Sequence, residues 1–234
     1  MMRIVMRVLT SLLFMTLATQ AQEVATFHAQ RLKHDAALNT DPRSKMWREA
    51  PAVFFERGPL NDAVPGHRTE VQARWTSEAL YFLFTCPYEA LYLKPSPDPV
   101  QETNKLWDWD VAEIFIGAVG DPVYRYKEFE VSPQNEWVDL DIDSRHLDGD
   151  KQLLWNSGFE HVVRIDAAKK VWYAAMRIPI KSITGHPVAK GTAFRVNLFR
   201  MQGPPPDRKA LAWRPTGKET FHVPEAFGRL LLGE

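Results

Sequence analysis

The segment "LWDWDVAEIFIG", Leu106 to Gly117, places tryptophans and acidic side chains directly ahead of a strongly apolar run. In an extended strand alternate residues share a face. One face of this segment is therefore expected to carry Trp107, Trp109, Val111, Glu113 and Phe115. A buried charge is costly unless it is paired and hydrogen-bonded. Glu113 therefore needs either an internal partner or access to a cleft.

Two interpretations of Glu113 follow from its residue type. In the structural one it pairs with Arg74 or Arg200, and the neighbouring tryptophans belong to the core. In the binding one a tryptophan ring covers the apolar C–H face of a pyranose, and the carboxylate accepts hydrogen bonds from its hydroxyls. The sequence leaves both open.

A second acidic group lies in "YKEFEVSPQNEWVDLDID". We predict a hairpin that turns at 133–136, with Glu130 opposite Asp139 and Glu128 opposite Asp141. Like charges directly opposite one another destabilise a ladder, so a compensating charge is expected. Lysine or arginine from a neighbouring strand would supply it, and a hard cation such as Ca²⁺ is the alternative. Candidate oxygen ligands for Ca²⁺ in "DIDSRHLDGD" are Asp141, Asp143, Asp148 and Asp150, although their spacing is not that of an EF-hand loop.

The N-terminal residues have the pattern of an export signal. Arg3 and Arg7 precede an apolar run over 8–17, and small residues follow near Ala21. The run is too short to span a bilayer, so we predict a signal peptide over 1–21, cleaved after Ala21, and a secreted or periplasmic product. Residues 22–234 are expected to form one domain.

The remaining sequence favours an all-β fold. Short β-rich runs such as "VQARWT" and "LYFLFTC" alternate with turn residues, which predicts a single antiparallel β-sandwich of the jelly-roll or immunoglobulin-like kind. Short helical turns are expected in "PRSKMWREA" and "PIKSITG". The nearly balanced charge argues against nucleic acid or an anionic membrane as partner, and no later segment is apolar enough to cross a bilayer. Cys86 is alone, so no internal disulfide is expected.

The order of the motifs resembles carbohydrate-binding module family 9 and its relatives among the DOMON-like β-sandwiches. The segments that carry the resemblance are "LNTDPRSKMWREAP", "TEVQARWTSEALYFLFTC", "LWDWDVAEIFIG", "YKEFEVSPQNEWVDL", "MRIPIKSI", "FRVNLFRMQG", "LAWRPT" and "FHVPEAFGRLLL". Together they cover nearly all of the chain after the predicted signal.

The resemblance implies a calcium-stabilised, non-catalytic domain that holds a glycan end between two tryptophans. Trp107 resembles one platform and Glu113 the hydrogen-bonding carboxylate, while Trp213 in "LAWRPT" is the candidate for the opposing ring. The other candidate contacts to a mono-, oligo- or polysaccharide are Trp109, Arg125, Asn135, Asn197 and Arg200. Modules of this kind are commonly attached to glycoside hydrolases and serve carbohydrate catabolism, whereas we expect no second, catalytic domain within these 234 residues.

The sequence leaves three other functions open. Asp108, Asp110 and Glu113 are candidate carboxylates of a glycosidase, but one strand cannot flank a sugar from both sides. A DOMON-like redox module would bind its haem non-covalently, because no Cys-x-x-Cys-His attachment motif is present. The candidate haem ligands are Met176, Met201, His161 and His222. An adhesion or scaffold domain is the third.

Overall fold

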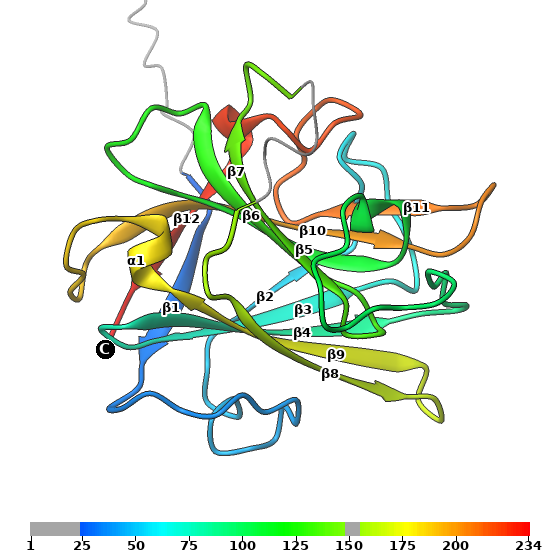
Figure 1. Ribbon diagram of the computed structural model, residues 1–234, viewed down its shortest axis with the longest axis horizontal. Helices are drawn as coiled ribbons and strands as arrows, with labels where there is room; N and C mark the ends of the chain where they lie inside the picture. Colours follow the sequence, from blue (N-terminus) through cyan, green and yellow to red (C-terminus); the bar gives the residue numbers. More distant parts are fainter. Residues whose placement is uncertain (1–23, 148–154) are drawn as a thin grey trace, which may run out of the picture.

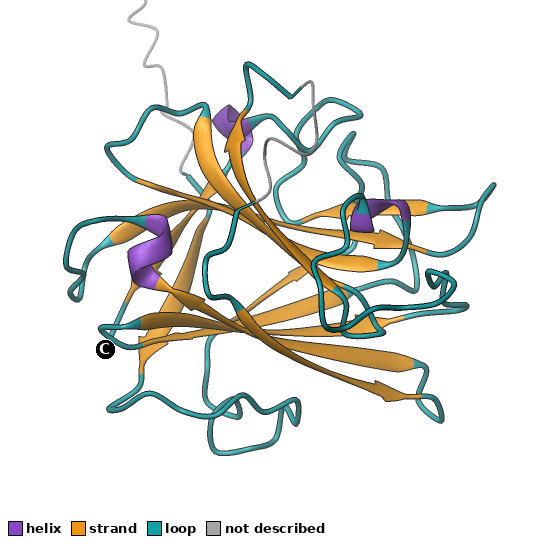
Figure 2. Ribbon diagram, in the orientation of Figure 1, coloured by secondary structure: helices purple, strands orange, loops and turns teal. Residues whose placement is uncertain are grey.

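The computed structural model describes residues 24–147 and 155–234. The predicted signal peptide and the candidate ligands Asp148 and Asp150 lie outside the described residues. Strands dominate the described chain (Figure 2), which confirms the all-β class. The described helices are α1 (Ile180–Ile183) and the 3₁₀ turns η1 (Leu106–Asp108) and η3 (Pro224–Ala226). Helix α1 lies in "PIKSITG" as predicted, whereas "PRSKMWREA" forms turns.

The described strands are β1 (Thr26–Arg31), β2 (Ala52–Phe55), β3 (Thr69–Trp75), β4 (Ala79–Pro87), β5 (Val111–Ala118), β6 (Arg125–Val131), β7 (Trp137–Asp143), β8 (Glu160–Asp166), β9 (Val171–Pro179), β10 (Ala193–Gln202), β11 (Lys209–Ala212) and β12 (Gly228–Leu232). The predicted hairpin of "VQARWT" and "LYFLFTC" is the antiparallel pair β3 and β4.

These strands form one curled 12-stranded sheet with the order β7-β6-β5-β10-β12-β1-β3-β4-β9-β8. Strand β11 pairs with β10, and β2 pairs with β3. The result is a half-barrel, in which β5 and β10 run above β3, β4 and β9 (Figure 1). The predicted wholly antiparallel sandwich is therefore corrected, because β1 belongs to both halves. Its residues 26–29 pair in parallel with β12, and 30–31 pair in parallel with β3.

The main core fills the space inside the curl. Alternation along β5 turns Ala112, Ile114 and Ile116 inward, where they meet large side chains of the opposite half such as Phe82 and Phe84. Trp75 and Trp172 are buried in this core. Cys86 is also buried there, and burial raises the pKa of its thiol to about 11, so it packs as a small apolar residue.

A second apolar cluster covers the outer face of β5, β6, β7 and β10. It includes Val111, Phe115, Tyr126, Leu140 and Phe199. The 3₁₀ turn η1 adds Leu106 and Trp107 at one end, and the segment between β11 and β12 adds Phe221 and Phe227. Strand β5 is consequently buried on both faces along its whole length, although it carries a glutamate.

Arg195 on β10 holds the turn between β5 and β6. Its guanidinium donates hydrogen bonds to the backbone carbonyls of Ala118, Asp121, Pro122, Val123 and Arg125, at 2.7 to 3.4 Å. Arg195 thus gives hydrogen-bond donors to turn carbonyl groups that have no partner in the β-ladder. It thereby fixes the two strands on which the buried acidic side chains are placed. Among the described residues no helix is long and apolar enough to cross a membrane.

Candidate functional site

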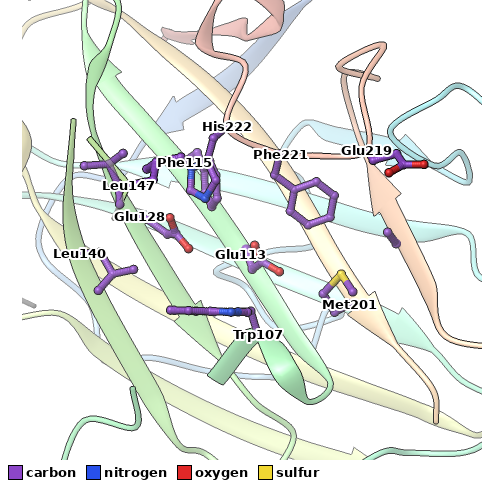
Figure 3. Close-up of a pocket in the computed structure, with 12 residues that line it drawn as sticks. Trp107, Glu113, Phe115, Glu128, Leu140, Leu147, Met201, Glu219, Phe221 and His222 are labelled. Atoms are coloured by element: carbon purple, nitrogen blue, oxygen red, sulfur yellow. The ribbon is translucent and has the colours of Figure 1, made fainter. Parts of the chain in front are cut away.

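A cavity of about 240 Å³ opens on the outer face of the β5–β6–β7–β10 half, within the second apolar cluster. Its lining residues are Trp107, Glu113, Phe115, Glu128, Leu140, Ile142, Leu147, Met201, Ala210, Glu219, Phe221 and His222. In Figure 3 Trp107 lies on one side of the two central carboxylates, Glu113 and Glu128, and Phe221 and His222 lie on the other. The cavity thus has aromatic walls and an acidic floor.

The acidic floor follows from strand alternation. On β5 the sequence Val111, Glu113, Phe115 faces outward, as predicted from the pattern. On β6 the side chains of Tyr126, Glu128 and Glu130 share that face. In the ladder Glu113 stands opposite Glu130, and Phe115 stands opposite Glu128. Two adjacent strands therefore place three glutamates side by side.

Burial perturbs the floor carboxylates strongly. Glu113 is 1% exposed, and burial together with the neighbouring Glu128 raises its pKa well above the ordinary value, an effect that Arg208 partly opposes. Burial raises the pKa of Glu128 to about 7. Glu113 does not pair with either predicted arginine. Arg200 faces the inside of the curl near Thr69, and Arg74 binds Met46 O and Gln30.

The walls of the cavity are held by rings that pack on one another. Phe221 stacks on Phe199 with ring centroids 4.1 Å apart, and His222 stacks on Phe115 at 5.2 Å. His222 Nδ1 and the Tyr126 hydroxyl share a 2.7 Å hydrogen bond. Burial lowers the pKa of His222 to about 4, so its ring is neutral at physiological pH. His222 therefore serves as a structural hydrogen-bonding residue, and its ring also lines the cavity.

Trp107 belongs to η1, not to β5. The strand begins at Val111, so the prediction that a single extended strand carries Trp107 is wrong in its local structure. The ring still reaches the same cavity as Glu113, and it is partly exposed there. Arg208 fixes η1 by donating hydrogen bonds to the carbonyls of Trp107 and Trp109, and it donates another to Gly203 O.

Removing the Arg208 guanidinium is expected to loosen η1. In Arg208→Ala the hydrogen bonds to the carbonyls of Trp107 and of Trp109, the residue that follows η1, are lost, and we expect the free energy of unfolding to fall by about 2 kcal/mol. Amide exchange at Asp108 and Trp109, whose N–H groups close the turn, should accelerate at least several-fold. Hydrogen exchange followed by NMR measures this, with exposed Lys209→Ala as the control. Equal exchange rates in the two variants would show that Arg208 does not hold the turn.

Most of the other predicted contact residues lie away from this cavity. Trp109 packs on Tyr92, with ring centroids 4.6 Å apart. Trp213 packs against Phe27 at 6.1 Å and lines a different groove beside β2. The structure therefore does not bring Trp213 opposite Trp107, and Phe221 lies there instead.

The predicted polar contacts are likewise held elsewhere. Asn197 is fully buried, donates to Arg214 O and accepts from Arg214 N, so it anchors the backbone. Asn135 lies in the β6–β7 turn, and its side-chain oxygen is 3.0 Å from Nδ1 of His161. Arg125 is the first residue of β6, 3.4 Å from Asp141. Arg200 lies inside the curl, as described above.

The predicted calcium ligands are committed to ion pairs where the structure describes them. Asp141 is 2.7 Å from Lys127 Nζ, and Asp143 is 2.7 Å from Arg145. The β6–β7 register also differs from the prediction by one residue, since Glu130 stands opposite Val138 and Glu128 opposite Leu140. A one-residue shift turns every side chain of the partner strand to the other face. Asp139 and Asp141 consequently do not share the face of Glu128 and Glu130, and the predicted four-carboxylate cluster is wrong.

The candidate haem ligands are not brought together as a group. Met201 and His222 line the cavity, but Met176 lies in the main core and His161 packs on Trp137. Of the three candidate glycosidase carboxylates, Glu113 lines the cavity and the other two do not. Asp110 is buried and accepts hydrogen bonds from the backbone of Tyr92 and Gly203, whereas Asp108 is exposed.

The sequence matches a family model described as carbohydrate family 9 binding domain-like, over residues 43–234. The chain belongs to this family. The match covers most of the chain and all of the strands from β2 to β12, including those that build the cavity. The family resemblance drawn from the order of the motifs is thereby confirmed.

Relatives of this family 9-like domain include an extracellular protein of Arthroderma benhamiae, which is 25% identical over 184 residues, 73% of this chain and 81% of the relative. A Bacteroides uniformis structure, described as that of a candidate carbohydrate-binding protein, has a TM-score of 0.71 at 15% identity and covers 90% of this chain and 100% of its own.

Two structures of a family 9 carbohydrate-binding module from Caldicellulosiruptor kristjanssonii share the same fold. The complex with glucose has a TM-score of 0.63 at 14% identity, covering 90% of this chain and 97% of that one. The complex with cellotriose has a TM-score of 0.61 at 13% identity, covering 89% and 94%. At these identities the similarity establishes the fold of the family 9-like domain.

Sequence reasoning missed part of this domain's cavity. Phe221 and Met201 were not singled out as wall residues, because the loop that carries Phe221 has no periodic pattern. The alternation of Glu128 and Glu130 with Lys127 and Phe129 along β6 does predict that the two glutamates share one face of the strand. Their neighbourhood with Glu113 depends on the pairing of β5 with β6, which local sequence does not give.

Proposed function

We propose that this chain is an exported, non-catalytic sugar-binding domain whose cavity takes one pyranose unit between Trp107 and Phe221. The observation that carries the proposal is the joint presence of an aromatic ring and hydrogen-bonding carboxylates in one cavity of a family 9-like domain. Solved family 9 modules of this fold are complexes with glucose and cellotriose.

The chemistry of the cavity suits a sugar. Axial C–H groups make one face of a pyranose apolar, and the partly exposed Trp107 ring offers a flat surface for it. The equatorial hydroxyls are donors, and Glu113 and Glu128 supply acceptor oxygens. The cavity volume of about 240 Å³ corresponds to roughly eight water molecules, which favours a single unit or the end of a chain over a longer segment.

The arrangement of the carboxylates favours binding over hydrolysis. Glycosidases place an acid and a second carboxylate on opposite sides of the scissile bond. Glu113 and Glu128 instead project from adjacent strands on one wall, with carboxylate oxygens within 4.8 Å of each other. A sugar bound on this wall would meet both groups from the same side.

Export is proposed on independent grounds. The basic and apolar pattern of residues 1–21 supports a signal peptide cleaved after Ala21, and a relative of the chain is an extracellular protein. Outside the cytoplasm, the domain would take part in polysaccharide utilisation by binding sugars. Its ligand would then be a mono-, oligo- or polysaccharide present outside the cytoplasm.

Calorimetric titration of residues 22–234 tests this function. We expect saturable heat with glucose and with cellotriose, of similar affinity, because one cavity accommodates one terminal unit. A weaker response to galactose, which differs from glucose in the orientation of one hydroxyl group, would indicate that the carboxylates distinguish that orientation. A folded, colourless protein that releases no heat with any of these sugars would contradict the proposal.

A further inference from the structure

Three buried carboxylates meet at the floor of the cavity. Glu113, Glu128 and Glu130 each offer an oxygen atom, and these atoms all lie within 4.8 Å of one another. Their exposures are 1%, 3% and 0%. Within the described chain Glu113 Oε1, Glu128 Oε2 and both carboxylate oxygens of Glu130 have no hydrogen-bond partner. When all three side chains are ionised these oxygens have no donor, and a proton held by Glu130 can bridge only Glu130 and Glu128.

No ion pair among the described residues includes any of these three glutamates. Two cations on neighbouring elements are engaged elsewhere, since Lys127 Nζ is 2.7 Å from Asp141, and Arg208 donates to the carbonyls of Gly203 and Trp107. A buried charge without a partner costs several kcal/mol. The carboxylates must therefore be neutralised either by protons or by a cation placed among them.

The position of Glu130 distinguishes a compact ion from a larger cationic ligand. Glu113 and Glu128 line the cavity, whereas Glu130 does not and has no exposed surface. An organic molecule in the cavity would reach only the first two. A single ion lying between the three side chains would contact all of them. Bonds of 2.3–2.6 Å to Ca²⁺ place ligands on opposite sides of the ion about 5 Å apart, which matches the spacing of the three oxygens.

The donor set defines the class of ion. All three side chains offer carboxylate oxygens, which favour hard cations such as Ca²⁺ and Mg²⁺ over zinc. Magnesium requires shorter bonds in a near-regular octahedron, whereas calcium accepts irregular sets of six to eight oxygens. Three glutamates projecting from two adjacent strands provide an irregular, one-sided set. The geometry fits calcium better.

We propose that Glu113, Glu128 and Glu130 form a Ca²⁺ site at the base of the cavity. Its remaining coordination positions face the cavity, where water or sugar hydroxyl oxygens complete the sphere. The part played by the sugar rests on the proposed function, whereas the ion site itself does not. This site is distinct from the aspartates that the sequence pattern suggested.

Terbium luminescence tests the site directly, because Tb³⁺ binds calcium sites and is sensitised by a nearby tryptophan such as Trp107. In the absence of sugar we expect saturable luminescence that Ca²⁺ displaces. Glu130→Gln should weaken Ca²⁺ binding by roughly tenfold or more, since it removes one charged ligand. Ca²⁺ should raise the melting temperature of the wild type and leave that of Glu130→Gln almost unchanged, which also shows that the variant is folded.

The double variant Asp141→Asn with Asp143→Asn is the matched control, and it should bind Ca²⁺ like the wild type. Loss of binding in this control but not in Glu130→Gln would overturn the proposal. The absence of saturable binding at millimolar Ca²⁺ would overturn it as well. Sugar titrations in Ca²⁺ and in EDTA separate the two proposals. Sugar binding without any Ca²⁺ binding refutes only the ion site, and Ca²⁺ binding without sugar binding refutes only the proposed function.

Discussion

Trp107→Ala is expected to weaken the binding of glucose and cellotriose by about 2 kcal/mol or more, roughly thirty-fold. The ring is partly exposed, lines the cavity and lies across the carboxylates from Phe221. It therefore contributes contact area to a bound pyranose, while its neighbour Leu106 anchors η1 in the apolar cluster. Calorimetry on the wild type and the variant measures the loss.

Trp109→Ala is the matched control for this experiment. It removes a ring of the same size two residues away, one that packs on Tyr92 and does not line the cavity. We expect its sugar affinity to stay within about twofold of the wild type. If both variants lose affinity equally, the effect comes from loosening of the loop, and the Trp107 platform is refuted.

Glu130→Gln is expected to stabilise the calcium-free protein at alkaline pH. The substitution removes one of three neighbouring carboxylates that form no ion pair among the described residues, and an amide retains the shape of the side chain. At pH 8 in EDTA we expect the free energy of unfolding to rise by about 1–3 kcal/mol, because the neutral amide adds no charge to the buried group and its N–H can donate to a neighbouring carboxylate. Urea denaturation measures it.

The wild type should show the corresponding pH dependence in EDTA. Burial raises the pKa of Glu128 from 4.5 to about 7, so between these values the folded protein binds more protons than the unfolded chain. The free energy of unfolding therefore falls as pH rises from about 5 to 7.5, by up to about 3 kcal/mol from this group. Below pH 4.5 Glu128 is protonated in both the folded and the unfolded state, so the stability that it contributes is fully present there.

Denaturation curves at several pH values within this window check the trend. Glu130→Gln should show a shallower decline than the wild type, because Glu130, whose own pKa is raised by burial and by the neighbouring Glu113 and Glu128, no longer titrates. Asp141→Asn, at an ion pair on the other face, should follow the wild type. A wild-type stability that stays level or rises from pH 5 to 7.5 in EDTA would contradict the account of the carboxylate group.

Strand alternation was enough to predict which face of β5 carries Glu113. The apolar residues Ala112, Ile114 and Ile116 had to enter the main core, and this fixed the opposite face. The same logic could not predict that the outer face is covered too. That depends on η1 and on the Phe221 segment, whose positions are set by tertiary contacts such as those of Arg208.

The β6–β7 hairpin shows how turn length limits such reasoning. The turn spans 132–136, with Ser132 N bonded to Glu136 O and Asn135 at φ 65°. The predicted shorter turn shifts the ladder by one residue and places Asp139 beside Glu130. Because side chains alternate with a period of two, that single residue decided which acidic groups meet.

Ring type alone did not identify the second wall of the cavity. Trp213 was a reasonable candidate as a tryptophan in a late loop, but it packs beside Phe27 and Gly228. Phe221 occupies the wall because the chain after Trp213 returns across the outer face toward β12. Loop paths of this kind depend on contacts far apart in the sequence.

Crystals of residues 22–234 grown with Ca²⁺ and cellotriose would test the central claim most directly. The account predicts one sugar unit between Trp107 and Phe221, with hydroxyl oxygens toward Glu113 and Glu128. Sugar density bound elsewhere, such as in the groove beside Trp213, with the cavity free of sugar, would contradict it.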